Sequence, residues 1–247
     1  KEAYQEQINK RILLRMPMQR RIFFMSFFVT PYVDEYGDTT YNLTAAGYTG
    51  LVLLLIVLLL AGCAIFGGKK KMNARQLVFS AMAITLATVT SMIKLFDMPM
   101  GGSVTLLSML FIVLVGYWYG LGGGLTAAFA YGILQLIIDP YILSLPQMLV
   151  DYLFAFGALG LSGLFSNSKH GLIKGYIAGV LGRYFFAFLS GWIFFGTYAP
   201  ENFPNAVVYS LAYNGAYLAA EAVITLIIIS LPPVSKALQT VKRQATE

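Results

Sequence analysis

Long, uninterrupted apolar runs constrain this chain more than any other feature of its sequence. Every residue from Leu51 to Leu60 is aliphatic, and further apolar segments follow almost to the end of the chain. A helix needs roughly 20 apolar residues to cross a hydrocarbon layer about 30 Å thick. Only 11% of the 247 residues are charged, against roughly 25% in an ordinary soluble domain. These observations exclude a soluble globular enzyme and predict an all-α polytopic membrane protein.

The apolar segments and the breaks between them predict four parts. Residues 1–42 mix basic, acidic and aromatic side chains, which favours an amphipathic arm at the membrane surface. Residues 43–71 form an additional transmembrane anchor helix, residues 72–235 a six-helix substrate-binding membrane domain, and residues 236–247 a cytoplasmic tail. The six helices of the membrane domain are expected at roughly 76–96, 104–119, 122–138, 147–166, 174–196 and 206–230.

The basic residues indicate orientation in the membrane. The net charge is +6, but the lysines and arginines cluster in alternate loops beside apolar runs, as in Lys69–Lys71. The opposite loops carry Asp97, Asp139 and Glu201. Because cytoplasmic loops are enriched in lysine and arginine, we expect the basic side to face the cytoplasm. The partner that this charge indicates is membrane lipid, and not nucleic acid.

Three ionisable residues fall within predicted helices: Asp151, Arg183 and Glu221. Each costs at least about 2.5–3.5 kcal/mol at membrane depth and therefore needs a partner or a water-filled cavity. One interpretation is that Asp151 and Arg183 neutralise each other and hold two helices together. The other is that Asp151 faces a cavity and binds a cationic ligand. For Glu221, among alanines, a structural role is favoured.

No catalytic motif is present. The only histidine, His170, lies in a cytoplasmic loop, so neither a His-Glu-x-x-His metalloprotease nor a serine–histidine hydrolase is encoded. The glycine-rich segment Gly120–Gly124 lacks the Gly-Lys-Ser/Thr of a phosphate-binding loop, so the chain has no ATPase motif. Cys63 is the only cysteine and forms neither an internal disulfide nor a cysteine metal cage. We expect no enzyme, no cofactor and no metal.

Five separated segments carry a more specific signal. They are Gly101–Met109, Gly116–Gly120, Tyr141–Tyr152, Arg183–Phe195 and Tyr209–Asn214. Their order and spacing, over about residues 75–235, resemble the thiamine-type substrate-binding S-component of energy-coupling factor (ECF) vitamin transporters.

The resemblance implies a substrate-capture subunit of an ATP-driven vitamin importer. Such a subunit has six helices and binds thiamine, or a thiamine-like precursor, from the outer side of a prokaryotic plasma membrane. It docks on a transmembrane coupling subunit that is driven by two cytoplasmic ATPase subunits. Ala83 and Ala87, at the four-residue spacing typical of close helix contacts, fall where the family packs against the coupling subunit.

The resemblance also implies a set of ligand-binding positions. They are Tyr141, Asp151, Tyr152, Arg183, Gly191, Phe195, Tyr209 and Asn214. Asp151 takes the place of a family glutamate that pairs with the thiazolium cation, and Arg183 replaces a lysine. This chain also has Ala187 in place of a ligand-contacting histidine and Phe195 in place of a stacking tryptophan, and it lacks a loop tryptophan near Gly102.

These positions have expected roles. Asp151 should supply charge. Three polar side chains should hydrogen bond to the ligand: Tyr152, Tyr209 and Asn214. Three aromatic side chains should supply apolar surface: Tyr141, Phe195 and Trp192.

Two alternative functions remain compatible with the sequence. The same pocket in an S-component could take a different vitamin or precursor. A stand-alone carrier could instead couple transport to protons, with Asp151 and Glu221 as relays. A purely structural scaffold is a third possibility, and it predicts no binding of a small molecule.

Overall fold

The computed structural model describes residues 27, 29–33, 39–47, 49–50, 53, 57, 73–98, 102–200 and 203–247. The chain divides into two units, residues 1–57 and 58–247. In the first, strands β1 (Val29–Val33) and β2 (Thr39–Leu43) pair in an antiparallel hairpin, which the sequence did not predict. Most of the predicted arm and anchor helix lies outside the described residues.

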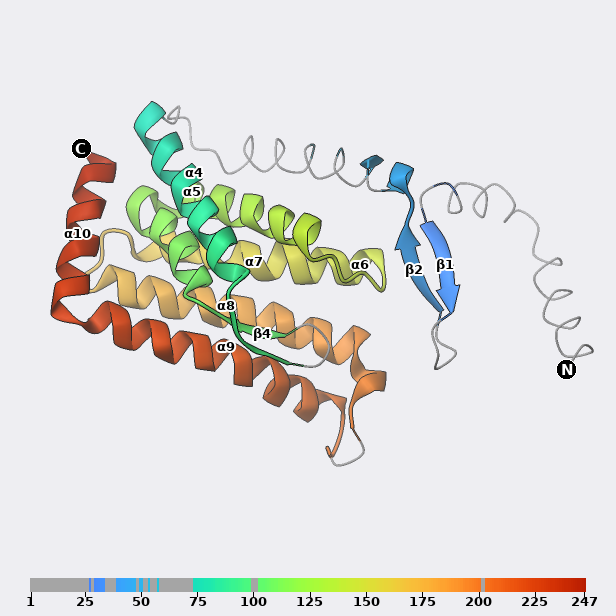
Figure 1. Ribbon diagram of the computed structural model, residues 1–247. Helices are drawn as coiled ribbons and strands as arrows, with labels where there is room; N and C mark the ends of the chain where they lie inside the picture. Colours follow the sequence, from blue (N-terminus) through green and yellow to red (C-terminus); the bar gives the residue numbers. More distant parts are fainter. Residues whose placement is uncertain are drawn as a thin grey trace, which may run out of the picture. The chain divides into compact units, whose positions relative to one another are not determined.

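The second unit is mostly helical, and the ribbon in Figure 1 shows its long helices. These are α4 (Ala74–Ser91), α5 (Ser108–Ile138), α8 (Gly171–Phe194), α9 (Ala206–Ser230) and α10 (Pro232–Thr246). A helical run of changing pitch lies between α5 and α8. It comprises α6 (Leu145–Met148), the π-helical η2 (Leu149–Phe154), α7 (Ala155–Gly157) and the 3-10 helix η3 (Ala158–Phe165). A short 3-10 turn, η4 (Gly196–Tyr198), follows α8.

Four helical stretches of the described residues are long and apolar enough to cross a membrane. They are Ser108–Ile138, Leu145–Phe165, Gly171–Phe194 and Ala206–Ser230. Many of the large apolar side chains on these stretches are exposed, as expected for helices that contact lipid. The unit is therefore a polytopic membrane protein.

Helix α5 reverses direction within its length. Gly120 has φ 78° and ψ −170°, a backbone conformation that interrupts the helix and that only glycine adopts readily. A Cβ atom on Gly124 would lie 2.7 Å from the Gly116 Cα atom, although eight residues of straight helix span about 12 Å. The two halves of α5 therefore lie side by side as a helical hairpin.

Small residues also join α5 to η3. A Cβ on Gly116 would collide with the Ser162 side chain, and a Cβ on Gly124 would lie 2.7 Å from the Gly160 carbonyl oxygen. Small residues permit such close approach of helices, whose association in lipid depends on packing and not on hydrophobic burial. Close packing therefore holds α5 against η3.

The predicted helix over residues 76–96 ends earlier than expected. Helix α4 stops at Ser91, where the hydroxyls of Thr90 and Ser91 donate to carbonyls three or four residues back. Strand β3 (Lys94–Asp97) follows and pairs antiparallel with β4 (Ser103–Thr105). The expectation of an all-α chain is therefore wrong here, because the residues after α4 pair as a β-hairpin.

The face of α4 predicted to dock on a partner is buried. Ala83 and Ala87 are 3% and 0% exposed, and the Ala87 carbonyl accepts a hydrogen bond from the Tyr131 hydroxyl. Both side chains contact the core of the protein itself, which corrects the predicted docking face. Exposed small residues at the same spacing, Ala81 and Thr85, lie on the other side of this helix.

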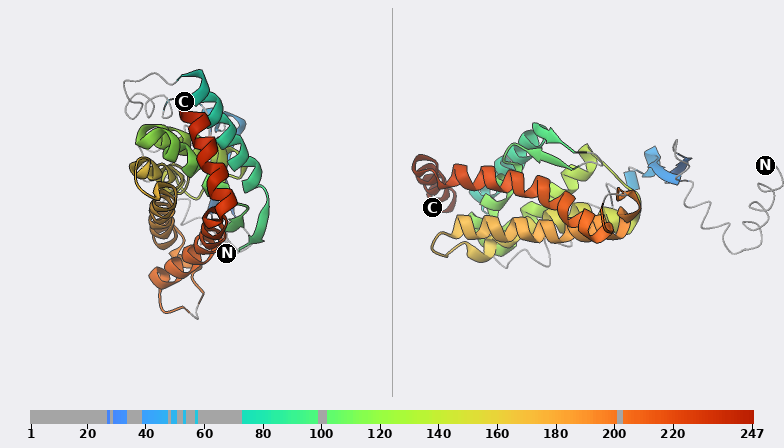
Figure 2. Two further views of the ribbon diagram at one scale, coloured as in Figure 1. Left: turned by 90° about the vertical axis from the view of Figure 1, so that its left-hand side faces the viewer. Right: turned by 90° about the horizontal axis from the view of Figure 1, so that it is seen from below.

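The predicted tail is helical and belongs to the fold. Both views in Figure 2 show α10 standing across the end of the helices that it contacts. Lys242 Nζ donates to the Ser166 carbonyl oxygen at 2.6 Å and lies 3.7 Å from the centre of the Tyr117 ring. The Tyr119 hydroxyl donates to the Ala245 carbonyl oxygen at 3.2 Å. Partial burial lowers the pKa of Lys242 below its usual value.

Candidate functional site

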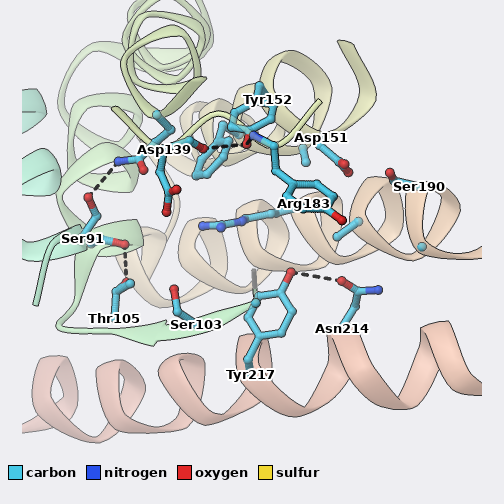
Figure 3. A pocket seen from close by; sticks show the side chains of 18 of the residues that line it. Ser91, Ser103, Thr105, Asp139, Asp151, Tyr152, Arg183, Ser190, Asn214 and Tyr217 are labelled. Carbon is cyan, nitrogen blue, oxygen red and sulfur yellow. Dashed lines mark hydrogen bonds between the residues drawn. The ribbon is translucent and has the colours of Figure 1, made fainter. Parts of the chain in front are cut away.

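A cavity of about 440 Å³ lies between the helices of the second unit. Its walls come from the α4–β3 and β4–α5 segments, from residues 139–156, and from α8 and α9. Figure 3 shows side chains that line it. All eight residues predicted from the sequence line this single space. They are Tyr141, Asp151, Tyr152, Arg183, Gly191, Phe195, Tyr209 and Asn214. The structure therefore brings together residues that are up to 73 positions apart (214 − 141).

Asp151 reaches the cavity from η2, where the helix widens. Gln147, one turn earlier, donates from Nε2 to Asp151 Oδ2 at 2.6 Å. The same Gln147 side chain is buried, accepts from the Leu143 N–H at 2.9 Å and donates to the Tyr141 carbonyl at 3.0 Å. Gln147 therefore orients the carboxylate and the loop before it. The sequence analysis missed Gln147, although its spacing of four residues from Asp151 was a usable signal.

Arg183 enters the cavity from α8. Its guanidinium lies 4.1 Å from the centre of the Phe156 ring, a cation–π contact. Neither ion pair in the described part of the chain involves Asp151 or Arg183. The two charges line the same cavity but form no direct ion pair.

The Tyr152 hydroxyl joins two residues of the loop that follows α5. It accepts from the Tyr141 N–H at 2.8 Å and donates to the Asp139 carbonyl oxygen at 2.8 Å. The sequence analysis expected this hydroxyl to hydrogen bond to the ligand. In the structure it instead holds the loop that carries Tyr141.

Asn214 is held by its neighbours in the same way. Its Nδ2 donates to the Ser210 carbonyl and hydroxyl oxygens at 3.0 and 3.2 Å, and its Oδ1 accepts from the Tyr217 hydroxyl at 3.1 Å. The Ser210 hydroxyl donates to the Phe188 carbonyl at 2.7 Å and so ties α9 to α8. Gly191 permits this close approach, because a Cβ there would lie 2.8 Å from Asn214 Nδ2.

Aromatic rings line one end of the cavity. Tyr141 and Phe195 stack with ring centres 5.7 Å apart and planes 27° apart. Tyr209 contacts Phe203 and Tyr213 at 5.1 and 5.7 Å.

The two tryptophans lie elsewhere. Trp192, which the sequence analysis expected to offer surface to the ligand, is 45% exposed, stacks on Phe188 and does not line the cavity. Trp118 is buried against the edges of Phe79 and Tyr119, also away from the cavity.

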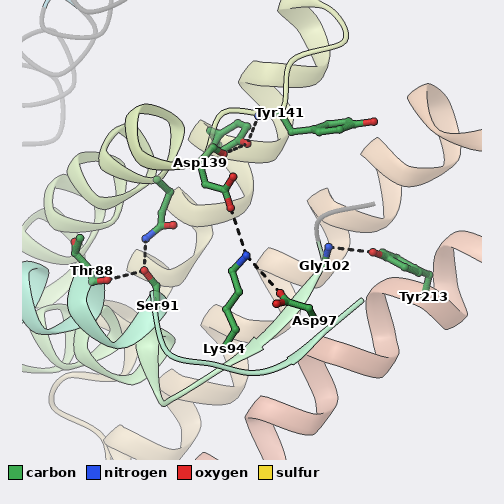
Figure 4. A network of polar contacts seen from close by, with 10 residues as sticks. Thr88, Ser91, Lys94, Asp97, Gly102, Asp139, Tyr141 and Tyr213 are labelled. Carbon is green, nitrogen blue, oxygen red and sulfur yellow. Dashed lines mark hydrogen bonds and ion pairs between the residues drawn. The ribbon is translucent and has the colours of Figure 1, made fainter. Parts of the chain in front are cut away.

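Charged residues at the mouth connect two loops. Figure 4 shows Lys94 between Asp97, at 3.4 Å, and Asp139, at 3.6 Å. The Gly102 N–H donates to the Tyr213 hydroxyl at 3.0 Å, which fixes the β3–β4 connection to α9. These contacts place both loops beside the open end of the cavity.

Glu221 lies outside the cavity and is 3% exposed. Its Oε2 accepts from the Thr105 N–H and hydroxyl at 3.1 and 2.6 Å. Its Oε1 accepts from the Ser108 hydroxyl at 3.3 Å and from the Met109 N–H at 3.2 Å. A carboxylate at the start of a helix also interacts favourably with the helix dipole. Glu221 therefore caps α5 from another helix, since the N-cap residue Leu107 offers no side-chain acceptor.

The fold and the cavity together define a class of protein: a polytopic membrane protein whose cavity, lined by charged and aromatic residues, suits a small molecule. Among the described residues, no group of three His, Cys, Asp or Glu side chains could hold a metal ion. The family described as Thiamine transporter protein (Thia_YuaJ) matches residues 77–241. The chain therefore belongs to this family, which confirms the resemblance found in the sequence.

Individual relatives agree with this assignment. Thiamine transporter ThiT of Bacillus subtilis (strain 168) is 33% identical over 168 residues, which cover 62% of this chain and 85% of that protein. Thiamine transporter ThiT of Lacticaseibacillus paracasei is 29% identical over 168 residues, covering 61% and 80%. A solved structure of ThiT from Listeria monocytogenes has a TM-score of 0.54 and 25% identity, and covers 76% of this chain and 97% of that one. The chain is a multi-pass transport protein of the cell membrane and not an enzyme.

Proposed function

We propose that this chain captures thiamine from the outer side of the membrane as the substrate-binding S-component of an ECF importer. Family membership supports the class of ligand. The observation that carries the proposal is the Asp151 carboxylate, which lines the cavity, accepts a hydrogen bond from Gln147 and forms no ion pair with a described residue. A carboxylate without a direct ion pair to the protein suits a cationic ligand.

Aromatic rings that line the same cavity support a cationic heterocycle. Tyr141 and Phe195 line the cavity as a stacked pair. A cation over aromatic faces gains about 2 kcal/mol or more where water is excluded. Phe195 thus keeps an aromatic ring where the family has tryptophan, and the thiazolium ring of thiamine supplies a permanent positive charge.

The proposal also assigns a role to each part of the chain. The six spans of an S-component correspond to α4, the two halves of α5, residues 145–165, α8 and α9. In this arrangement residues 72–235 form the substrate-binding domain, residues 43–71 an additional anchor, and residues 1–42 a surface arm. The partners are a transmembrane coupling subunit and two cytoplasmic ATPase subunits. On α4, docking would use the exposed face that carries Ala81 and Thr85.

The geometry does not favour the proton-coupled carrier. A relay needs acidic groups that exchange protons with the transport path, yet Glu221 lies outside the cavity and accepts four hydrogen bonds from α5 and the segment before it. Of the two proposed relay residues, only Asp151 lines the cavity.

Two measurements on the purified full chain test the function. Mass spectrometry of small molecules that copurify in detergent should detect thiamine. Calorimetry should then show thiamine binding about 30-fold more tightly than a neutral isostere in which carbon replaces the thiazolium nitrogen, which corresponds to about 2 kcal/mol. A different copurifying vitamin, with no heat signal from thiamine, would overturn the assignment to thiamine.

A further inference from the structure

The polar groups that line the cavity fall into two sets. In the first set the protein itself already supplies the hydrogen-bond partners. Its members are Gln147, Tyr152, Ser210, Asn214 and Tyr217. These side chains shape the cavity and hold its walls. The second set must provide the polar contacts to a ligand.

Ser190 belongs to the second set, and no other observation has assigned it a role. Its side chain lines the cavity and is 1% exposed. Its hydroxyl oxygen forms no hydrogen bond of 3.5 Å or less within the part of the chain that the structure describes, although it lies beside the Asp151 carboxylate. Leaving a buried hydroxyl unpaired costs about 1–3 kcal/mol, so such groups are rare without a reason.

The position of Ser190 on α8 places its hydroxyl among the predicted ligand contacts. Arg183, Ala187 and Ser190 follow each other at spacings of four and three residues, which puts them on one helix face. All three line the cavity. Ala187 stands where the family has a ligand-contacting histidine and offers no polar atom. Ser190 presents a polar atom one turn further along the same face.

Figure 3 shows the Ser190 hydroxyl beside the Asp151 carboxylate. An ionised carboxylate only accepts hydrogen bonds, and a serine hydroxyl has two acceptor lone pairs besides its one donor. Two acceptors side by side suit a ligand group with two N–H donors. The quaternary nitrogen of thiazolium has no N–H, so its attraction to Asp151 is purely electrostatic and leaves such a donor site free.

We propose that Ser190 is a ligand-contacting residue that, together with Asp151, accepts hydrogen bonds from a primary amino group on an aromatic ring of the ligand. In thiamine this group is the amino group of the pyrimidine ring. The assignment rests on the proposed function and names the part of the ligand that this side of the cavity recognises. It also explains how α8 keeps a polar contact although Ala187 has none.

Calorimetry with two compounds and two variants tests the assignment. The compounds are thiamine and an analogue in which hydrogen replaces the pyrimidine amino group. Ser190→Ala should weaken thiamine binding about tenfold, the effect of one hydrogen bond to a partly charged group. It should leave the affinity for the analogue unchanged within about twofold. Ser162→Ala is the matched control, because it removes a buried hydroxyl that donates to the Val113 carbonyl outside the cavity.

Thermal unfolding of the ligand-free variants shows whether each one is folded. Equal losses for both compounds in a folded Ser190→Ala protein would overturn the assignment, as would no loss for thiamine. If the wild-type protein bound thiamine but Ser190→Ala had no selective effect, only this inference would fail. If the wild-type protein bound neither compound, the proposed function would fail, and the role of Ser190 with it.

Discussion

Two carboxylates on the helices of this protein have opposite surroundings. Glu221 accepts four hydrogen bonds and lies against the first turn of α5. Asp151 accepts a hydrogen bond from the Gln147 side chain and lines the cavity. Burial of an ionised group is costly unless it is fully hydrogen bonded or paired. The protein itself meets this requirement for Glu221, and a ligand must complete it for Asp151.

The comparison separates a structural charge from a binding charge on physical grounds. Both residues are acidic and both lie in apolar helices, so residue type and depth alone do not distinguish them. The number of hydrogen bonds that the protein donates to each carboxylate does. Changing either residue should therefore affect a different property, stability for Glu221 and ligand affinity for Asp151.

The largest effect is expected for Glu221→Gln. An amide placed there cannot accept from every donor, so the Thr105 and Met109 N–H groups compete for one oxygen or lose their partner. A stranded buried donor costs about 1–3 kcal/mol, so two of them should lower the free energy of unfolding by about 2–6 kcal/mol. Chemical denaturation in detergent measures this loss. A well-folded Glu221→Gln protein with impaired thiamine binding would contradict this prediction, because it would give Glu221 a role in binding and not in stability.

Asp151→Asn should affect ligand affinity almost as strongly. It removes the charge that faces the cavity, and truncating one partner of a buried charge pair costs about 2–5 kcal/mol of binding. Melting temperature without ligand should change little, because no ion pair of Asp151 is broken within the described residues. Asp151→Glu, which keeps the charge, is the control. Unchanged thiamine affinity in folded Asp151→Asn would contradict the binding role.

A smaller effect is expected for Tyr152→Phe, which changes neither carboxylate. It removes the hydroxyl that joins the Tyr141 N–H to the Asp139 carbonyl oxygen. Loss of this loop contact should weaken binding by about 1–2 kcal/mol, mainly through faster dissociation. Stopped-flow release of thiamine measures the rate. A slower association with unchanged dissociation would instead indicate a direct contact in the initial complex.

The smallest effect is expected at the mouth of the cavity. Lys94→Ala breaks the ion pairs with Asp97 and Asp139, whose side chains are largely exposed. Exposed ion pairs contribute about 0–1 kcal/mol and are screened by salt. Stability should therefore fall by less than about 1 kcal/mol, and the difference from wild type should disappear in concentrated salt. A larger loss of stability that persists in concentrated salt would show that these charges, like Glu221, have a structural role.

The sequence was sufficient for the membrane class and for the set of residues around the cavity. Helix α9 begins and ends at the predicted residues, 206 and 230, because an asparagine cap precedes it and two prolines follow. The cavity residues were found through motifs whose spacing resembles a known family. Helix ends near Ser91 were predicted poorly, since strand pairing of Lys94–Asp97 depends on residues beyond the next turn.

The sequence could not show which side of a helix faces the core or which polar groups are already paired. The spacing of Ala83 and Ala87 indicates a close contact but not its partner. Likewise, the cap on α5 joins Glu221 to residues 112 to 116 positions away. Such contacts form only when the helices assemble, so the different surroundings of Glu221 and Asp151 cannot be inferred from composition or periodicity.

The position of the two tryptophans decides how this protein reports on its ligand in an optical experiment. Trp118 and Trp192 are the only tryptophans of the chain, and neither lines the cavity. Six tyrosines do: Tyr131, Tyr141, Tyr152, Tyr209, Tyr213 and Tyr217. A bound heterocycle would stack on phenol rings and leave the indoles untouched. Binding should therefore perturb the near-ultraviolet absorption and circular dichroism of tyrosine, with little contact quenching of indole emission. An indole placed by Phe195→Trp would turn the same cavity into a fluorescent sensor.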